Sequence, residues 1–198
     1  MGRAPVTGII RCDWANGSDA LRAYHDQEWG VPLHGDAALF EFLVLEGAQA
    51  GLSWRTVLDR RAAYRAAFHG YDIPRVAAMT DAELANVLSG SEIIRNRLKV
   101  LSVRANARAA LGVIATEGSL DAYLWSFVDY RPIVNAWTRA AEVPARTALS
   151  DAMSRALRKR GFGFVGSTIC YALMQATGMV NDHLTSCVCR TGAEWEGG

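Results

Sequence analysis

Hydrophobic residues recur at helical spacing along almost the whole chain, and runs that alternate between apolar and polar residues are scarce. This periodicity limits the fold more than any other feature of the sequence, and it predicts an all-α protein. With 198 residues, of which 51% are hydrophobic, the chain can bury a sizeable core. We expect residues 1–198 to form a single domain of two closely joined helical lobes, with flexible termini at 1–8 and 191–198.

Residues that favour helix N-termini predict where the helices begin. Asp36 precedes a helix with an apolar face, which should end in the small-residue stretch 47–51. Ser91 should open a longer helix in which Leu98 and Leu101 share one face, while Arg95, Arg97 and Lys99 form a solvated face. Further helices are expected to begin at Ser53, at Thr80 in a capping box with Glu83, and at Ser119, Ser150 and Ser167.

The charge balance restricts the partners that the chain can have. Lysine and arginine total 21 against 20 acidic residues, so no global basic field points to a polyanionic partner. Any contact with nucleic acid must therefore come from local patches. No apolar run approaches the roughly 20 residues of a bilayer span, and the first residues lack a signal-peptide core. We expect a soluble, cytoplasmic protein that has no membrane partner.

A glycine-rich connection between two predicted helices offers one such patch. Gly161 and Gly166 bracket a tight hairpin, Lys159 ends the helix before it, and Ser167 and Thr168 open the helix after it. Glycines expose backbone amides, and a helix N-terminus adds unpaired N–H donors, so the segment can hold a DNA phosphate. The alternative is an ordinary connection between two helices with a solvated basic last turn, which the local sequence alone favours.

Two pairs of metal-capable residues stand at opposite ends of the chain. Cys12 and His25 lie near the start, and His183 and Cys187 lie near the end. Two thiolates and two imidazoles form a tetrahedral zinc set, and a closed four-ligand site has a structural role. The alternative is unrelated core cysteines and surface histidines, and Cys189 is a rival ligand to Cys187. Cys170 lies in an apolar stretch and is interpreted as a packed core thiol.

A third group of residues suggests a binding pocket. Glu46 follows an apolar run that should be buried. A buried carboxylate needs either a hydrogen-bonding or charged partner or a functional role. Together with Tyr24, Trp14 and Trp54 it could bind a flat cation by charge and stacking. The alternatives are a helix-terminal carboxylate that reaches water and tryptophans that only pack.

Several uncommon strings occur in one order between about Arg11 and Cys189. The strings are Arg11-Cys12-x-Trp14, Ala23-Tyr24-His25-Asp26-x-Glu28-Trp29-Gly30-Val31-Pro32, Leu45-Glu46-Gly47-Ala48-Gln49-Ala50-Gly51-Leu52-Ser53-Trp54, Lys159-Arg160-Gly161-Phe162-x-Phe164-Val165-Gly166, Thr168-Ile169-Cys170-Tyr171 and Val180-Asn181-Asp182-His183. Together they resemble the bacterial 3-methyladenine DNA glycosylase I family. The sequence departs from the family pattern at Leu21, where relatives can carry an aromatic residue, and across 130–147.

The resemblance implies a helix-hairpin-helix DNA glycosylase in which one structural zinc ion joins the N- and C-terminal segments. The ligands would be Cys12, His25, His183 and Cys187. Glu46 and Tyr24 would bond the edge of an extruded 3-methyladenine and act as the catalytic residues, between the aromatic walls Trp14 and Trp54. Leu52 would fill the emptied base stack. The residues expected to contact DNA are Gln49, Gly51, Leu52, Lys159, Gly161, Gly166, Ser167 and Thr168.

The expected reaction is hydrolysis of the N-glycosidic bond in alkylated double-stranded DNA. Methylation at N3 makes the base cationic, so the bond is already weak and the base departs neutral. The enzyme must chiefly extrude and recognise the base, at a cost of a few kcal/mol for unstacking. Direct attack by water, without a lysine intermediate, would release free 3-methyladenine and leave an abasic site without strand cleavage. Asp182 is assigned a structural role, and no obligate protein partner is inferred. A zinc hydrolase and a non-catalytic DNA-binding module are the two alternatives.

Overall fold

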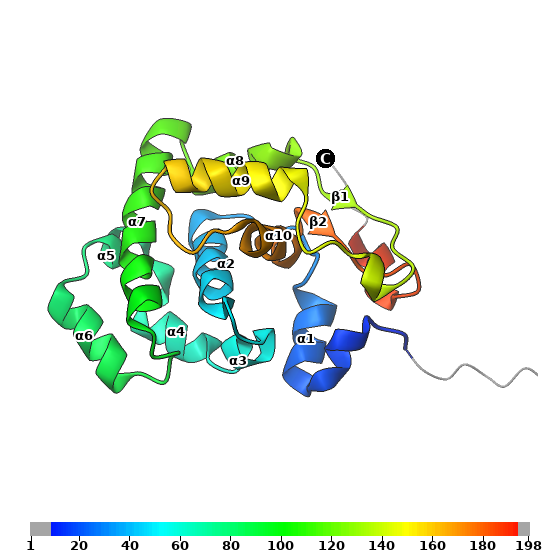
Figure 1. Ribbon diagram of the computed structural model, residues 1–198, viewed down its shortest axis with the longest axis horizontal. Coiled ribbons are helices and arrows are strands. Elements are labelled where there is room, and N and C mark those ends of the chain that lie inside the picture. The colour runs from blue at the N-terminus through cyan, green and yellow to red at the C-terminus, as the bar shows by residue number, and fades with distance from the viewer. Residues whose placement is uncertain (1–8, 194–198) are drawn as a thin grey trace, which may run out of the picture.

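The computed structural model of the protein describes residues 9–193 and is mostly helical, as predicted (Figure 1). The expected flexible termini lie outside the described residues, except that 191–193 end a 3-10 helix. The α-helices are α1 (Asp19–Gln27), α2 (Asp36–Gln49), α3 (Trp54–Leu58), α4 (Arg61–Ala67), α5 (Ile73–Ala77), α6 (Asp81–Gly90), α7 (Arg97–Glu117), α8 (Leu120–Trp125), α9 (Ala148–Lys159) and α10 (Ser167–Ala176). The 3-10 helices are η1 (Asp13–Gly17), η2 (His69–Tyr71), η3 (Ser126–Val128), η4 (Ala140–Glu142) and η5 (Val188–Ala193).

Helix α2 runs through the middle of the molecule, between α7 and α10 (Figure 1). Every residue from Leu39 to Ala48 is buried, because the helix is apolar on nearly all sides and is covered by neighbouring helices. Asp36 is the first residue of α2 rather than its N-cap, which is Gly35. The Asp36 carboxylate accepts a hydrogen bond from the Asp121 amide (2.9 Å), and this bond ties α2 to the start of α8.

Several of the predicted helix starts are confirmed. Ser53 caps α3, Thr80 and Glu83 form the capping box of α6, and Ser119 caps α8. Two predicted starts are wrong. Ser91 ends α6, and α7 begins only after Asn96, whose side chain accepts from the Lys99 amide. The cap of α9 is Thr147, and Ser150 lies at the third helical position, where it completes a capping box.

The later start of α7 changes which of its side chains are buried. Leu98 is 69% exposed, and the core face consists of small and β-branched residues that include Val100, Val103 and Ala107. Lys99, which was expected on a solvated face, is buried. Its amino group donates to the carbonyls of Ala48 and Ala50, both at 2.7 Å, at the C-terminal end of α2. Those carbonyl acceptors explain how a lysine can lie in the interior.

Residues 126–147 form an irregular part of the described interior, and Pro132 and Pro144 in this segment both lie outside its helices. Within it, β1 (Ile133–Val134) pairs in parallel with β2 (Val180–Asn181). These are the only two strands in residues 9–193, and the other regular elements there are helices. The pairing is two residues long, with Ile133 opposite Val180. It fixes the path of the chain just before Asp182 and His183.

Among the residues that the structure describes, no helix combines the length and the apolar character needed to cross a membrane. The arrangement as one domain of two lobes remains a prediction.

Candidate functional site

The two ends of the described chain meet at a buried cluster of two cysteines and two histidines. Ligand atoms of Cys12, His25, His183 and Cys187 all lie within 4.8 Å of one another, and all four residues are buried. The Cys187 sulfur lies 3.5 Å from His25 Nε2 and 3.4 Å from His183 Nδ1. The sulfur–nitrogen edge of a tetrahedral zinc site is about 3.6 Å, given the usual bond lengths. The cluster can therefore hold a metal ion.

Both histidines hold the ring orientation that metal binding requires. His25 Nδ1 faces Asp26 (2.8 Å to Oδ1), and His183 Nε2 faces the backbone carbonyl of Trp29 (2.9 Å). Such outer partners fix which ring nitrogen carries the proton and leave the other nitrogen for the metal. Asp26 is itself held by Arg11 through both carboxylate oxygens. Burial lowers the pKa of His183 to about 4, so its ring is neutral near pH 7.

A glycine allows the segments around this cluster to approach closely. Gly178 ends α10 with a positive φ of 70°, and a Cβ atom there would collide with the backbone of Val31 and Pro32. The position therefore requires glycine, because any side chain would push α10 away from the segment that follows α1.

The two remaining cysteines lie outside the four-residue cluster. The Cys189 sulfur is 3.8 Å from His25 Nδ1, the nitrogen that faces Asp26 rather than Cys187. It is therefore in the position of an outer neighbour. Cys170 is 1% exposed, as expected of a core thiol, and its sulfur donates to the carbonyl of Val165.

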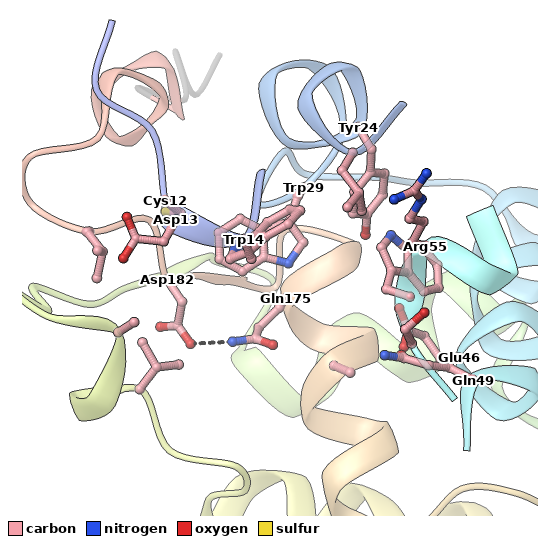
Figure 2. A pocket seen from close by; sticks show the side chains of 17 residues that line it. Cys12, Asp13, Trp14, Tyr24, Trp29, Glu46, Gln49, Arg55, Gln175 and Asp182 are labelled. Carbon is pink, nitrogen blue, oxygen red and sulfur yellow. Dashed lines mark hydrogen bonds between the residues drawn. The ribbon is translucent and has the colours of Figure 1, made fainter. Parts of the chain in front are cut away.

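A cavity of about 670 Å³ lies beside the cluster, within the size range of ligand pockets (Figure 2). It brings together all four residues that the sequence assigned to a pocket. The lining residues include Trp14, Leu21, Tyr24, Trp29, Glu46, Gln49, Trp54, Arg55, Gln175 and Asp182. Most of these come from η1, α1, the end of α2 and α10, so the pocket depends on segments far apart in the sequence.

Aromatic rings line the pocket and continue into the cysteine–histidine cluster. Tyr24 lies 5.1 Å from Trp54 and 6.1 Å from Trp14, measured between ring centroids. Trp29 packs against Trp14 at 5.1 Å on one side and against His183 at 4.7 Å on the other. The cysteine–histidine cluster therefore supports the wall of the pocket directly.

Glu46 brings a carboxylate into this aromatic surround. The residue is 3% exposed, and Oε2 has no hydrogen-bond partner among the described residues. Burial raises the pKa of Glu46 from 4.5 to about 8. The indole N–H of Trp54 is also buried without a partner in this part of the chain. A polar ligand in the pocket can satisfy both this buried acceptor and this buried donor.

Tyr24 supplies a phenol at the same site. Burial and the neighbouring carboxylates of Glu46 and Glu28 raise the pKa of Tyr24 well above its usual value. The hydroxyl therefore stays protonated and remains able to donate a hydrogen bond.

Asp182 lines the pocket, and its carboxylate is fully hydrogen-bonded. Its carboxylate accepts four hydrogen bonds of 2.6 to 2.8 Å, from Asn135, Trp137, Tyr171 and Gln175 (Figure 2 shows the bond to Gln175). These donors come from the irregular segment and from α10, so Asp182 joins the two. With four donors bound, the carboxylate has no acceptor position left for a substrate.

Sequence reasoning missed several of the pocket residues, among them Trp29 and Gln175. Trp29 and Gln175 both line the cavity, and neither was assigned a role. Trp29 lies in the string from Ala23 to Pro32, and its large aromatic ring could have marked it as a candidate pocket residue. Gln175 is an ordinary polar residue on an apolar helix, and only the fold brings it to the pocket.

The predicted DNA-contacting residues near the pocket lie in the turn after α2. Gln49 is half-buried at the pocket rim, Gly51 is exposed with a φ of 77°, and Leu52 is 41% exposed. A leucine held out in solvent next to a tight glycine turn can enter an apolar environment such as a base stack.

The glycine hairpin lies between α9 and α10 in the structure. Lys159, Gly161 and Thr168 are exposed, and Gly166 and Ser167 are half-buried. Gly166 caps α10 without a side-chain hydrogen bond, so the first amides of that helix have no side-chain cap. The hairpin also contacts α2, because a Cβ on Gly47 would lie 3.2 Å from the Cβ of Phe164.

Comparison with known proteins adds an independent line of information. A family model described as methyladenine glycosylase matches residues 14–191. The chain is 47% identical over 182 residues to DNA-3-methyladenine glycosylase 1 of Escherichia coli (strain K12), covering 92% of this chain and 97% of the relative.

Two solved structures are similar over nearly their whole length. A crystal structure of 3-methyladenine DNA glycosylase I is 48% identical with a TM-score of 0.88, covering 91% of this chain and 99% of the other. A Staphylococcus aureus 3-methyladenine DNA glycosylase I, solved to explain 3-methyladenine recognition, is 29% identical with a TM-score of 0.89, covering 92% and 97%.

Proposed function

The chain belongs to the methyladenine glycosylase family, and we propose on this premise that it excises 3-methyladenine from alkylated double-stranded DNA. It is a DNA glycosylase, an enzyme that hydrolyses the N-glycosidic bond. One observation on this chain's pocket carries the proposal. The buried Glu46 carboxylate lies in an aromatic cavity, and one of its oxygens has no hydrogen-bond partner among the described residues. A flat, positively charged base satisfies both features of that cavity.

Glu46 recognises the charge of the lesion. An N3-methylated adenine nucleotide carries a positive charge, and the Glu46 carboxylate accepts from its exocyclic amine. A cation next to Glu46 favours the ionised carboxylate and opposes the effect of burial on its pKa. Unmethylated adenine in DNA lacks this charge, so it offsets less of the cost of ionising a buried acid. Discrimination therefore rests on the charge of the base as well as its shape.

Tyr24, Trp54 and Trp14 orient the base. The protonated Tyr24 hydroxyl donates to a ring nitrogen, while Trp54 and Trp14 form the aromatic walls. Stacking of a base on an aromatic ring contributes about 1 to 3 kcal/mol. This recovers much of the few kcal/mol that extrusion of the base costs.

The bond breaks with little help from acid catalysis, because the departing base leaves as a neutral molecule. Water then attacks the oxocarbenium-like sugar. No lysine stands among the described residues that line the pocket, which supports direct hydrolysis rather than an amine-linked intermediate. The products are free 3-methyladenine and an abasic site in an intact strand.

Two surface elements hold the DNA in this proposal. Leu52, flanked by Gln49 and Gly51, fills the gap that the extruded base leaves. The helix-hairpin-helix element binds a backbone phosphate through its amides, with Lys159 nearby. Its participating residues would be Gly161, Gly166, Ser167 and Thr168. Phosphate contacts of this kind set the register of the protein on DNA and do not read the base.

The four-residue cluster would hold one structural zinc ion. Two cysteines and two histidines are a donor set typical of zinc, and four protein ligands leave no coordination position for water. The ion would supply a cross-link between the N- and C-terminal segments. This arrangement also argues against a zinc hydrolase, which needs an open position. The expected cytoplasmic location and the lack of an obligate protein partner remain predictions.

Product analysis tests the proposed function directly. Purified protein is incubated with a methylated duplex, the released bases are separated chromatographically, and the strands are run on a denaturing gel. We expect free 3-methyladenine together with strands that break only after alkali treatment. Tight binding without base release would make the protein a DNA-binding module, and breakage without alkali would contradict direct hydrolysis.

A further inference from the structure

Two buried polar side chains on one face of α7 each hold one of the elements proposed to contact DNA. Lys99 and Asn106 are separated by seven residues, or two helical turns, so they point to the same side of the helix. At 1.5 Å per residue their Cα atoms are about 10 Å apart along the axis. Figure 1 shows α7 running alongside α2, with the connection from α9 to α10 passing close to both.

Lys99 holds the end of α2. Its amino group donates to the carbonyls of Ala48 and Ala50, both at 2.7 Å. The last carbonyls of a helix have no partner within the helix, and a lysine there also complements the helix dipole. Those two residues flank Gln49 and directly precede the turn that carries Gly51 and Leu52. Lys99 therefore fixes the base of this turn.

Asn106 holds the hairpin in the same manner. Its Nδ2 donates to the carbonyl of Gly163 (3.1 Å), and its Oδ1 accepts from the amide of Gly163 (2.7 Å). Asn106 is 2% exposed, and these two bonds use both polar ends of its amide. They fix the middle of the hairpin onto α7, while Phe164 next to it packs on Gly47 of α2.

We propose that Lys99 and Asn106 are positioning residues that set the spacing between the Leu52 turn and the glycine hairpin on DNA. The inference rests on the proposed function, since it assigns both elements to one bound duplex. A duplex fixes the distance between the emptied base position and the phosphates beside it. A displacement of about 1 Å at either element would cost up to about a hundredfold in rate.

The test compares excision from DNA with binding of the free base. Lys99→Met and Asn106→Leu each remove the two hydrogen bonds of one residue and leave the pocket residues intact. We expect each variant to lower kcat/KM on a duplex with a single 3-methyladenine by about 10-fold to 100-fold, as misplacement predicts. Affinity for free 3-methyladenine should change by less than about twofold, because the base alone does not require the spacing. Lys99→Arg should restore most of the activity, since it retains a cationic donor.

Arg108→Met is the matched control, because it removes a similar contact from the same helix. Arg108 Nε donates to the carbonyl of Ala77 (2.9 Å), the last residue of α5. This variant should lose stability without losing excision, when both are measured well below the unfolding temperature. If Asn106→Leu does not fold, Asn106→Asp keeps the acceptor for the Gly163 amide and loses only the donor.

Three outcomes would overturn the inference: unchanged excision in both variants, equal losses in Arg108→Met, or a parallel fall in free-base affinity. The double variant gives a further criterion. Once one contact is gone the spacing is lost, so the second substitution should add less than about twofold to the loss of activity. Independent, fully additive losses would also refute the shared role. Failure of the unmodified protein to release 3-methyladenine would instead contradict the proposed function.

Discussion

Replacing Glu46 by glutamine should weaken the binding of free 3-methyladenine while preserving the fold. The substitution keeps the size of the side chain and removes its capacity to carry a negative charge. Because Glu46 is 3% exposed and no described group pairs with Oε2, little besides the ligand should sense the change. A loss of affinity in a well-folded variant would therefore report on the pocket itself.

The size of the effect follows from the hydrogen bond and the pKa of Glu46. A hydrogen bond to a charged group contributes about 1.5 to 3 kcal/mol, or roughly 10-fold to 100-fold in affinity. With a pKa of about 8, the carboxyl is mostly protonated at pH 7. Ionising it there costs about 1.4 kcal/mol, which offsets part of the gain. The loss in Glu46→Gln should therefore be larger at pH 9 than at pH 7.

The pH dependence of stability has the same origin. Between pH 4.5 and about 8 the folded protein keeps a proton on Glu46 that the unfolded chain has lost. The stabilisation linked to this proton therefore declines as the pH rises through that window. Glutamine removes this dependence, so Glu46→Gln should unfold at a higher temperature than the unmodified protein at pH 7, and the difference should be larger at pH 9.

Isothermal titration with 3-methyladenine at pH 7 and pH 9, with thermal unfolding in parallel, measures both effects. Glu41→Gln is the matched control, because Glu41 is the other buried carboxylate of α2 and pairs with Arg61 and Arg65. It should lose stability and keep base affinity. Equal affinities of the Glu46 variant and the unmodified protein at pH 9 would refute the reasoning, as would an equal loss in Glu41→Gln.

Three further predictions test other parts of the site. Cys12→Ser or His183→Ala should lower metal content and unfolding temperature together, whereas Cys189→Ser should change neither; full metal occupancy in Cys12→Ser, by elemental analysis, would argue against the ligand set. Gly166→Leu should weaken binding to damaged and undamaged duplexes alike in a titration, since phosphate contacts carry no base information; a loss limited to damaged DNA would remove the hairpin from that role. Trp54→Ala should cost about 1 to 3 kcal/mol of free-base binding energy through lost stacking, and an unchanged dissociation constant would return Trp54 to a packing role.

The features that sequence predicted well depend on local patterns or on distinctive residue types. The capping box at Thr80 and the caps at Ser53 and Ser119 are local, because the side chain bonds an amide two or three residues away. The four residues that meet in the buried cysteine–histidine cluster were identifiable because cysteine and histidine are few in this chain.

The features that sequence missed depend on competition between neighbouring caps or on contacts between distant segments. Ser91 has the chemistry of a helix cap, yet Asn96 takes that role at the start of α7, and the Ser91 hydroxyl donates to the Val87 carbonyl of the preceding helix. Lys99 was assigned to solvent because lysine is seldom buried, and the carbonyls that satisfy it lie 51 and 49 residues away. The four partners of Asp182 likewise meet only in the folded protein.

The central claim is that the methylated base occupies the aromatic pocket beside Glu46. An experimental structure of the protein with bound 3-methyladenine measures this most directly. We predict that the base stacks on Trp54, with its exocyclic amine within about 3 Å of a Glu46 carboxylate oxygen, as a hydrogen bond requires. A base bound elsewhere, or bound in the cavity with Glu46 turned away from it, would contradict the claim.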